Sequence, residues 1–276
     1  MIFTGFVNGP LTVLAGVAVA VALVSLLQRF FDQRTLAASH GTTGNLLAVV
    51  GTLYAVMLGL VVVDAMVRFE RAIDVVQAES TALADIHIMA ERLPEPFGSR
   101  VKGACRDYAV AVVETEWERL AERGEPSIEA RRAGLRVLRS LDGYEPETES
   151  QKALYPMIVQ EMQAAWDHRR ERIATAHYGV PAVEWVALLL GALVTVTLGG
   201  LFPFGHFRFH LLVTSLAALV MVLNLYLVSL FGYPFSGDLR VSDLPFRTDI
   251  GIFDGLYDEP ANAEGRPAEP AHPVLR

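Results

Sequence analysis

Cysteine and histidine, the side chains most typical of transition-metal sites and nucleophilic chemistry, number only one and seven in this 276-residue chain, and their spacing favours neither chemistry. The single cysteine, Cys105, excludes a disulfide within the chain and a cysteine-based zinc site. It falls on an apolar helical stripe, where a buried structural thiol is a simpler interpretation than a nucleophile with a lowered pKa. His87 and Glu91 form a helical i, i+4 pair, but two ligands are too few for a metal site unless another helix or subunit adds more.

The motifs of common enzymes are also missing from the sequence, which has no phosphate loop, dinucleotide fingerprint, nucleophile elbow or HExxH pattern. We therefore expect a protein that is not an enzyme, with no catalytic residue, bound metal or cofactor. Residues 65–179 contain 16 basic and 20 acidic side chains, a net charge of −4. Because nucleic-acid binding needs a basic surface, we expect no nucleic-acid partner.

The chemistry that remains is ion passage, and its candidates lie in a charge-free run that ends at Val63. Thr52, Val56, Leu60 and Val63 recur at helical spacing, and Asp64 follows directly. If this helix lines a pore, its apolar side chains would form a constriction that gates conduction by dewetting, and Asp64 would place charge at the mouth. The alternative is that the small residues of this run only pack against other helices in lipid.

Two further polar features lie in or beside apolar runs. Asp64 and Arg68 stand one helical turn apart, so they are predicted to form an interfacial ion pair, and their alternative role is charge at a channel mouth. Asn224 lies in the middle of another charge-free run. Because an amide in lipid needs a partner, we expect an interhelical hydrogen bond there rather than direct contact with an ion.

These residues must be positioned by helices that cross a membrane. The 54 charged residues leave four charge-free windows, at 1–28, 35–63, 185–207 and 209–237. Each window supplies the roughly 20 apolar residues that an α-helix needs to cross the hydrocarbon core, which excludes an ordinary soluble domain. The predicted spans are 11–27, 45–63, 181–201 and 209–231.

The distribution of basic residues predicts the topology. The first window resembles a signal peptide in its small residues, but no Lys or Arg precedes Arg29, which favours a retained span. Seven Lys and Arg near the span ends on one side, against three on the other, predict that both termini lie in the cytoplasm. The predicted organisation is 1–64 for the first two spans, 65–179 for a cytoplasmic insert, 180–232 for the last two spans, 233–258 for a C-terminal arm and 259–276 for a disordered tail.

The insert is predicted to be helical. Apolar residues continue at helical spacing past Asp64 as far as Arg92, so the second span should extend as one helix of about 48 residues, roughly 70 Å long. Further helices are predicted at 97–123 and 127–141. A last helix should begin at a capping box of Thr148 and Gln151, kink or restart at Pro156, and end near residue 177.

Several local strings resemble the bestrophin-like family of bacterial membrane proteins, which is related to the bestrophin channels. They are GLVVVDAMVRFERAIDVVQAES at 59–80, LPEP at 93–96 and YPFSGDLRVSDLPF at 233–246. In bestrophins, a helix leaving the membrane carries an Arg followed by an aromatic residue, a Glu and then Arg or Ala. Arg68, Phe69, Glu70 and Arg71 look similar and form the helix-exit motif.

The resemblance implies an assembly and a function. It implies a pentamer around a central axis, with the second helix lining a neck and the cytoplasmic helices forming a vestibule. The sequence departs from the bestrophin pattern in the neck, where Val, Leu, Ala and Gly replace the expected bulky aromatic or isoleucine residues. From the resemblance, our first hypothesis is an oligomeric, ion-channel-like protein in the lipid bilayer of the bacterial inner membrane, with ions as candidate ligands. The alternative is a non-conducting scaffold or sensor, and a membrane-bound hydrolase is disfavoured by the missing motifs.

Overall fold

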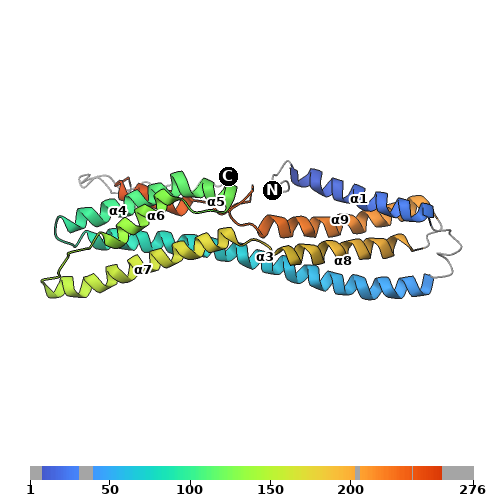
Figure 1. Cartoon of the computed structure of the whole chain (residues 1–276), viewed down its shortest axis with the longest axis horizontal. Helices are drawn as coiled ribbons and strands as arrows, with labels where there is room; N and C mark the ends of the chain where they lie inside the picture. The colour runs from blue at the N-terminus through green and yellow to red at the C-terminus, as the bar shows by residue number, and fades with distance from the viewer. Residues whose placement is uncertain (1–7, 31–39, 203–205, 238, 257–276) are drawn as a thin grey trace, which may run out of the picture.

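The computed structural model describes residues 8–30, 40–202, 206–237 and 239–256, and all regular structure in these ranges is helical. The molecule is elongated, with α1, α8 and α9 at one end and α4 to α7 at the other, and α3 runs through both halves (Figure 1). Four helices of the described part are long and apolar enough to cross a membrane. The elements are α1 Asn8–Phe30, α3 His40–Ala90, α4 Phe97–Ala111, the π-helical turn η1 Val112–Glu116, α5 Trp117–Arg123, α6 Ile128–Arg139, α7 Glu149–His177, α8 Ala182–Gly200, α9 Phe207–Phe231 and α10 Leu244–Phe253.

Helix α3 is the element that joins the two halves. It has 51 residues and spans roughly 75 Å at about 1.5 Å per residue. Its last 30 residues contain neither glycine nor proline, so the backbone hydrogen bonds continue without interruption as far as Ala90. The predicted extension of the second span beyond the membrane is confirmed, and the helix ends two residues before the predicted Arg92.

The other helices of the insert begin where side chains cap them. Ser127 accepts a hydrogen bond from the Ala130 amide at 3.2 Å and starts α6. Thr148 and Gln151 form the predicted capping box of α7, in which the Gln151 amide donates to the Thr148 hydroxyl at 3.2 Å. Helix α7 then passes through Pro156 without a restart. These caps satisfy amides that the first turn of a helix leaves unpaired.

The segment predicted as one helix at 97–123 is divided in the structure. Helix α4 ends at Ala111, a π-helical turn occupies Val112–Glu116, and α5 continues to Arg123. The wider turn adds one residue to the helical repeat and thereby changes which side chains face the interior. Glu116 enters the core at this point and is fully buried.

The described part of the segment predicted as a C-terminal arm contains α10 Leu244–Phe253. Val241 and Phe246 are buried in the core of the insert, and the Trp117 indole donates to the Val241 carbonyl at 3.2 Å. A second, smaller core lies among α3, α8 and α9 within the spans. The predicted disordered tail at 259–276 lies outside the described residues.

Candidate functional site

The four apolar or hydroxyl candidates for a pore lining share one exposed face of α3. The side chains of Val56, Leu60 and Val63 are 59, 67 and 58% exposed in the single chain, and Thr52 is also exposed. At 100° per residue, these positions lie within about 80° of the helix circumference. The Thr52 hydroxyl donates to the Ala48 carbonyl of its own helix at 2.7 Å, so this polar group has a hydrogen-bond partner within the span.

The same face stays exposed along the part of α3 that leaves the membrane. We call this surface the α3 stripe; it consists of Thr52, Val56, Leu60, Val63, Val67, Glu70, Asp74, Thr81 and Asp85. On the opposite side of the helix, Tyr54 and Leu58 are buried against the other spans, and Ala72 and Val76 are buried in the insert. The stripe is apolar in the membrane half and polar with three carboxylates in the insert.

Asp64 lies about a quarter turn away from the centre of the stripe, since it follows Val63 directly. It accepts a hydrogen bond from Arg68 Nε at 2.7 Å, and both side chains remain partly exposed. The predicted ion pair is therefore present. The charge of Asp64 is thus matched by Arg68. The three carboxylates of the stripe, Glu70, Asp74 and Asp85, form no ion pair with another described residue.

The four residues of the helix-exit motif face different surroundings. Arg68 pairs with Asp64, as above. Phe69 packs edge-on against Phe231 at the end of α9, with ring centroids 5.6 Å apart. Glu70 is exposed on the stripe, and Arg71 Nε donates to Glu171 Oε1 of α7 at 2.8 Å. The motif thus contacts α9 through Phe69 and α7 through Arg71, while the Glu70 carboxylate faces outward.

Asn224 makes a different contact from the one expected. Its amide nitrogen donates to the Val220 carbonyl of the same helix at 2.8 Å. The expected interhelical hydrogen bond is therefore wrong for the described chain, because the carbonyl one turn back lies within reach of the amide.

Behind the stripe lies a buried ionic network that sequence reasoning missed. Arg172 of α7 donates to both oxygens of Glu79 on α3, at 2.6 and 3.0 Å, and to Glu116 of the π turn at 2.8 Å. Arg169 donates to the other oxygen of Glu116 at 2.5 Å, and the Tyr108 hydroxyl donates to Glu79. Two carboxylates face two guanidinium groups, so the network is neutral although all five residues are buried.

The network changes the pKa of two of its members, Arg172 and Tyr108. Burial alone would lower the pKa of Arg172, but Glu79 and Glu116 outweigh burial and hold that pKa well above its usual value. Burial and the adjacent Glu79 raise the pKa of the Tyr108 hydroxyl. The sequence carried one signal of this arrangement: Glu79 interrupts the apolar stripe between Val76 and Leu83.

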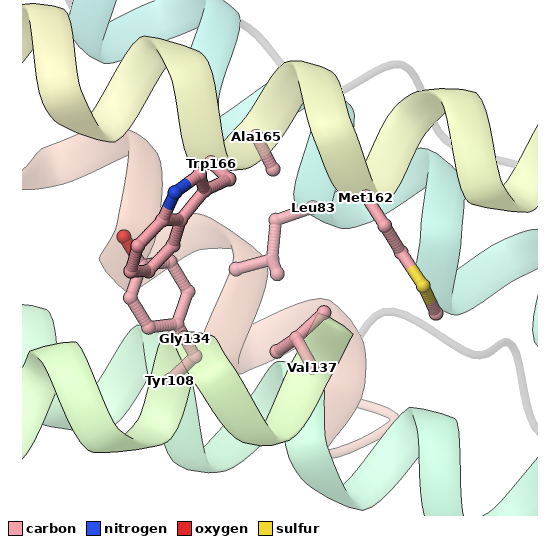
Figure 2. Close-up of a pocket in the computed structure, with 7 residues that line it drawn as sticks. All are labelled: Leu83, Tyr108, Gly134, Val137, Met162, Ala165 and Trp166. Carbon is pink, nitrogen blue, oxygen red and sulfur yellow. The ribbon is translucent and has the colours of Figure 1, made fainter. Parts of the chain in front are cut away.

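A small apolar cavity lies beside the network, with room for about one water molecule. Figure 2 shows it lined by Leu83, Tyr108, Gly134, Val137, Met162, Ala165 and Trp166. A Cβ added to Gly134 would approach the Trp166 ring to 3.1 Å and the Tyr108 ring to 3.3 Å, so the absence of a side chain permits this close packing. The cavity is too small to hold a substrate.

The two residues first considered for chemistry are part of the packing. Cys105 is fully buried, and burial followed by the nearby charge of Asp249 raises the pKa of its thiol, which confirms the structural interpretation. The His87 ring stacks on Phe253 of α10 with centroids 4.2 Å apart. Within the described ranges, no three His, Cys, Asp or Glu side chains lie together as a metal site.

Comparison with known protein families matches residues 14–246 to the Bestrophin-like domain. The chain belongs to the Bestrophin-like family. This confirms the resemblance found in the sequence strings, and with the four apolar helices it confirms an all-α membrane protein. A search of curated proteins finds no match to this bestrophin-like chain.

Solved bestrophin homologues share the fold. A bestrophin homologue from Klebsiella pneumoniae with one leucine-to-threonine substitution has a TM-score of 0.70 and 12% identity, covering 90% of this chain and 99% of that chain. A tryptophan-to-alanine variant of the homologue has a TM-score of 0.62 and 14% identity, covering 88% of this chain and 95% of its own. At this identity the likeness extends to the fold of the bestrophin-like chain.

Proposed function

We propose that copies of this chain assemble around the α3 stripe and form an ion-conducting path along it. The observation that carries the proposal is the continuous exposure of one face of α3 over both halves of the molecule. The other spans cover the opposite side of the helix, where Tyr54 packs against Gly191 of α8. Membership of the Bestrophin-like family supports a channel-like role, and the solved homologues support the fold on which it depends.

The membrane half of the stripe supplies a constriction. Val56, Leu60 and Val63 occupy successive turns, so equivalent side chains from several copies would form stacked apolar rings. Such rings gate conduction when water leaves them. The number of copies proposed from the family resemblance is five.

The charges along the stripe favour cations. Glu70, Asp74 and Asp85 are exposed on it below the constriction, and several copies would multiply these charges around the axis. The basic side chains nearest to them are already paired, Arg68 with Asp64 and Arg71 with Glu171. A path lined by carboxylates raises the local concentration of cations and repels anions. We therefore propose selectivity for cations.

Two observations support the proposed membrane position of the chain. Trp185 at the start of α8 donates to the Tyr233 hydroxyl beyond α9 at 3.3 Å, and such aromatic pairs are typical of the membrane interface. Together with the uneven distribution of Lys and Arg near the span ends, this aromatic pair supports a chain that spans a bacterial inner membrane, with the insert and both termini in the cytoplasm.

A non-conducting scaffold or sensor is the second candidate. It is favoured by the valines at 61–63 and by the absence of any charged side chain on the stripe above Asp64. In this case the stripe would only pack copies together, and the insert would transmit contacts between the membrane and a cytoplasmic partner.

Ion flux from liposomes distinguishes the two functions. The purified protein is reconstituted after its oligomeric state is measured in native membranes, and K⁺, Na⁺ and Cl⁻ fluxes are compared. The channel proposal predicts cation flux, reduced when Glu70→Gln and Asp74→Asn are combined. Leu189→Ala, on an exposed surface of α8 and not part of the stripe, is the matched control and should leave flux unchanged. An oligomer that passes neither cations nor anions would refute conduction.

A further inference from the structure

We infer that the outward face of α6 is a docking surface for an acidic, amphipathic helix of a cytoplasmic partner protein. The docking surface consists of Ile128, Arg131, Arg132, Leu135, Arg136 and Arg139. This inference is independent of conduction, because the surface belongs to the insert and contributes nothing to the α3 stripe. Its position in the cytoplasm depends on the topology proposed above.

The core holds α6 rigidly in place. At its N-terminus, the Ser127 amide donates to the buried Glu116 carboxylate at 3.0 Å, and Ser127 Oγ caps the helix. In its middle, Gly134 lies against Trp166 of α7 and Tyr108 of α4. A partner would therefore meet a preformed surface, and little conformational entropy would be lost on that side when it binds.

The outward face concentrates positive charge in an otherwise acidic protein. The 12 residues of α6 include four arginines and one acidic residue, whereas the whole chain has a net charge of −8. Arg136 has a loose contact of 3.6 Å with Asp107, and both side chains are more than half exposed. The structure gives Arg131, Arg132 and Arg139 no carboxylate within ion-pair distance among the described residues. Glu129 of the same helix interacts electrostatically with Arg132 but forms no ion pair with it, so the face keeps a net positive charge for a partner.

The pattern on this face fits a helix rather than a nucleic acid. Arg132, Arg136 and Arg139 follow one another at i, i+4 and i+7, the spacing at which glutamates project from one face of a facing helix. Ile128 is 57% exposed and lies seven residues before the half-buried Leu135, so an apolar strip runs between the arginines. An apolar strip suits the leucines of an amphipathic helix, and phosphates gain nothing from it.

The position of α6 excludes the bilayer as the occupant. It lies in the half of the molecule away from α1, α8 and α9, parallel to the long axis (Figure 1). Helices α4 and α7 contact both α3 and α6, which places α6 on the far side of the insert from the α3 stripe. In an assembly around the stripe, the docking surface would face the cytoplasm and remain accessible.

Fluorescence anisotropy with the full chain in lipid nanodiscs tests the inference. The probe is a labelled helical peptide with glutamates at i, i+4 and i+7 and leucines between them. Its competitors are the same peptide with glutamine in place of glutamate and a single-stranded DNA of similar length. We expect the glutamate peptide to bind, with an affinity that falls as salt is raised because the contacts are exposed charges.

Two charge-matched triple variants locate the binding. Arg132→Glu, Arg136→Glu and Arg139→Glu together should weaken the peptide at least about tenfold, since three attractive contacts become repulsive. The control variant combines Arg100→Glu, Arg123→Glu and Arg170→Glu, which change the net charge equally at exposed positions outside the docking surface. It should leave the affinity for the peptide unchanged. Ile128→Ser should weaken the glutamate peptide at constant charge. Intrinsic tryptophan fluorescence verifies that each variant is folded.

Four results would overturn the inference. They are no binding of the glutamate peptide, equal losses in the two triple variants, tighter binding of DNA that the α6 variant abolishes, and peptide binding that requires neutralisation of the acidic residues at 258–269. The last result would identify the chain's own C-terminal segment as the occupant instead of a partner protein.

Discussion

Arg172→Met should destabilise the insert more than any substitution of an exposed arginine. The substitution keeps most of the side-chain volume but removes three hydrogen bonds to Glu79 and Glu116, at 2.6, 3.0 and 2.8 Å. Glu116 keeps Arg169, while Glu79 keeps only the Tyr108 hydroxyl, so one buried carboxylate loses its counter-charge. Removing one partner of a buried ion pair costs about 3–5 kcal/mol.

Two matched variants separate this effect from the loss of an arginine as such. Arg71→Met removes an exposed pair with Glu171 and should cost about 0–1 kcal/mol. Adding Glu79→Gln to Arg172→Met leaves the Glu116 and Arg169 pair neutral by itself. The double variant should therefore recover a large part of the lost stability, because no buried charge remains unpaired.

Tryptophan fluorescence during heating in detergent micelles measures these differences. Trp117 lies 5.5 Å from the Arg172 guanidinium carbon and Trp166 lies 5.5 Å from that of Arg169, so two of the three tryptophans report on the network. A loss of 3–5 kcal/mol should lower the midpoint by roughly 6–20 °C for a chain of this size. Equal midpoints for Arg172→Met and Arg71→Met, or a double variant less stable than Arg172→Met, would refute the reasoning.

Two further predictions concern α10 and the spans. Burial raises the pKa of Asp249 to about 6, and the hydrogen bond from Ser80 partly offsets this rise. The folded protein therefore favours the protonated carboxyl, and the stability that this contributes at low pH is lost as the pH rises from about 4 through about 6. Asp249→Asn should flatten this fall in the unfolding midpoint, and a dependence as steep as in the wild type would contradict the assignment. In the spans, a Cβ at Gly191 would lie 2.4 Å from the Tyr54 ring, so Gly191→Val should lower the unfolding midpoint through overpacking that costs about 1–3 kcal/mol. Gly51 has open space around it, so Gly51→Val should leave the midpoint unchanged. Equal effects of the two substitutions would count against the contact between α3 and α8.

The helices could be predicted from the sequence because their signals are local. The charge-free windows gave the spans, and the lack of glycine and proline after Leu60 gave the extension of α3. The capping box of Thr148 and Gln151 gave the start of α7. Each of these signals depends on residues a few positions apart, so no knowledge of the tertiary fold was needed.

The buried network could not be predicted because its members are distant in the chain. Glu79 and Arg172 are 93 residues apart, so the place of Glu79 on an apolar stripe signals burial but does not indicate which residue pairs with it. The π turn that brings Glu116 inward also has no signature in the sequence. The prediction for Asn224 was wrong because its partner is local: the amide donates to a carbonyl of its own helix, and no second helix is needed.

Single-channel recording of a cysteine variant tests the α3 stripe most directly. Val63→Cys is made in a Cys105→Ala background and recorded in planar bilayers before and after addition of a cationic thiol reagent, with Leu189→Cys, exposed on α8, as the control. The account predicts cation currents that the reagent reduces in the Val63→Cys protein and leaves unchanged in the control. Currents that the reagent does not affect at Val63, or that it reduces equally in both variants, would contradict an ion path along α3.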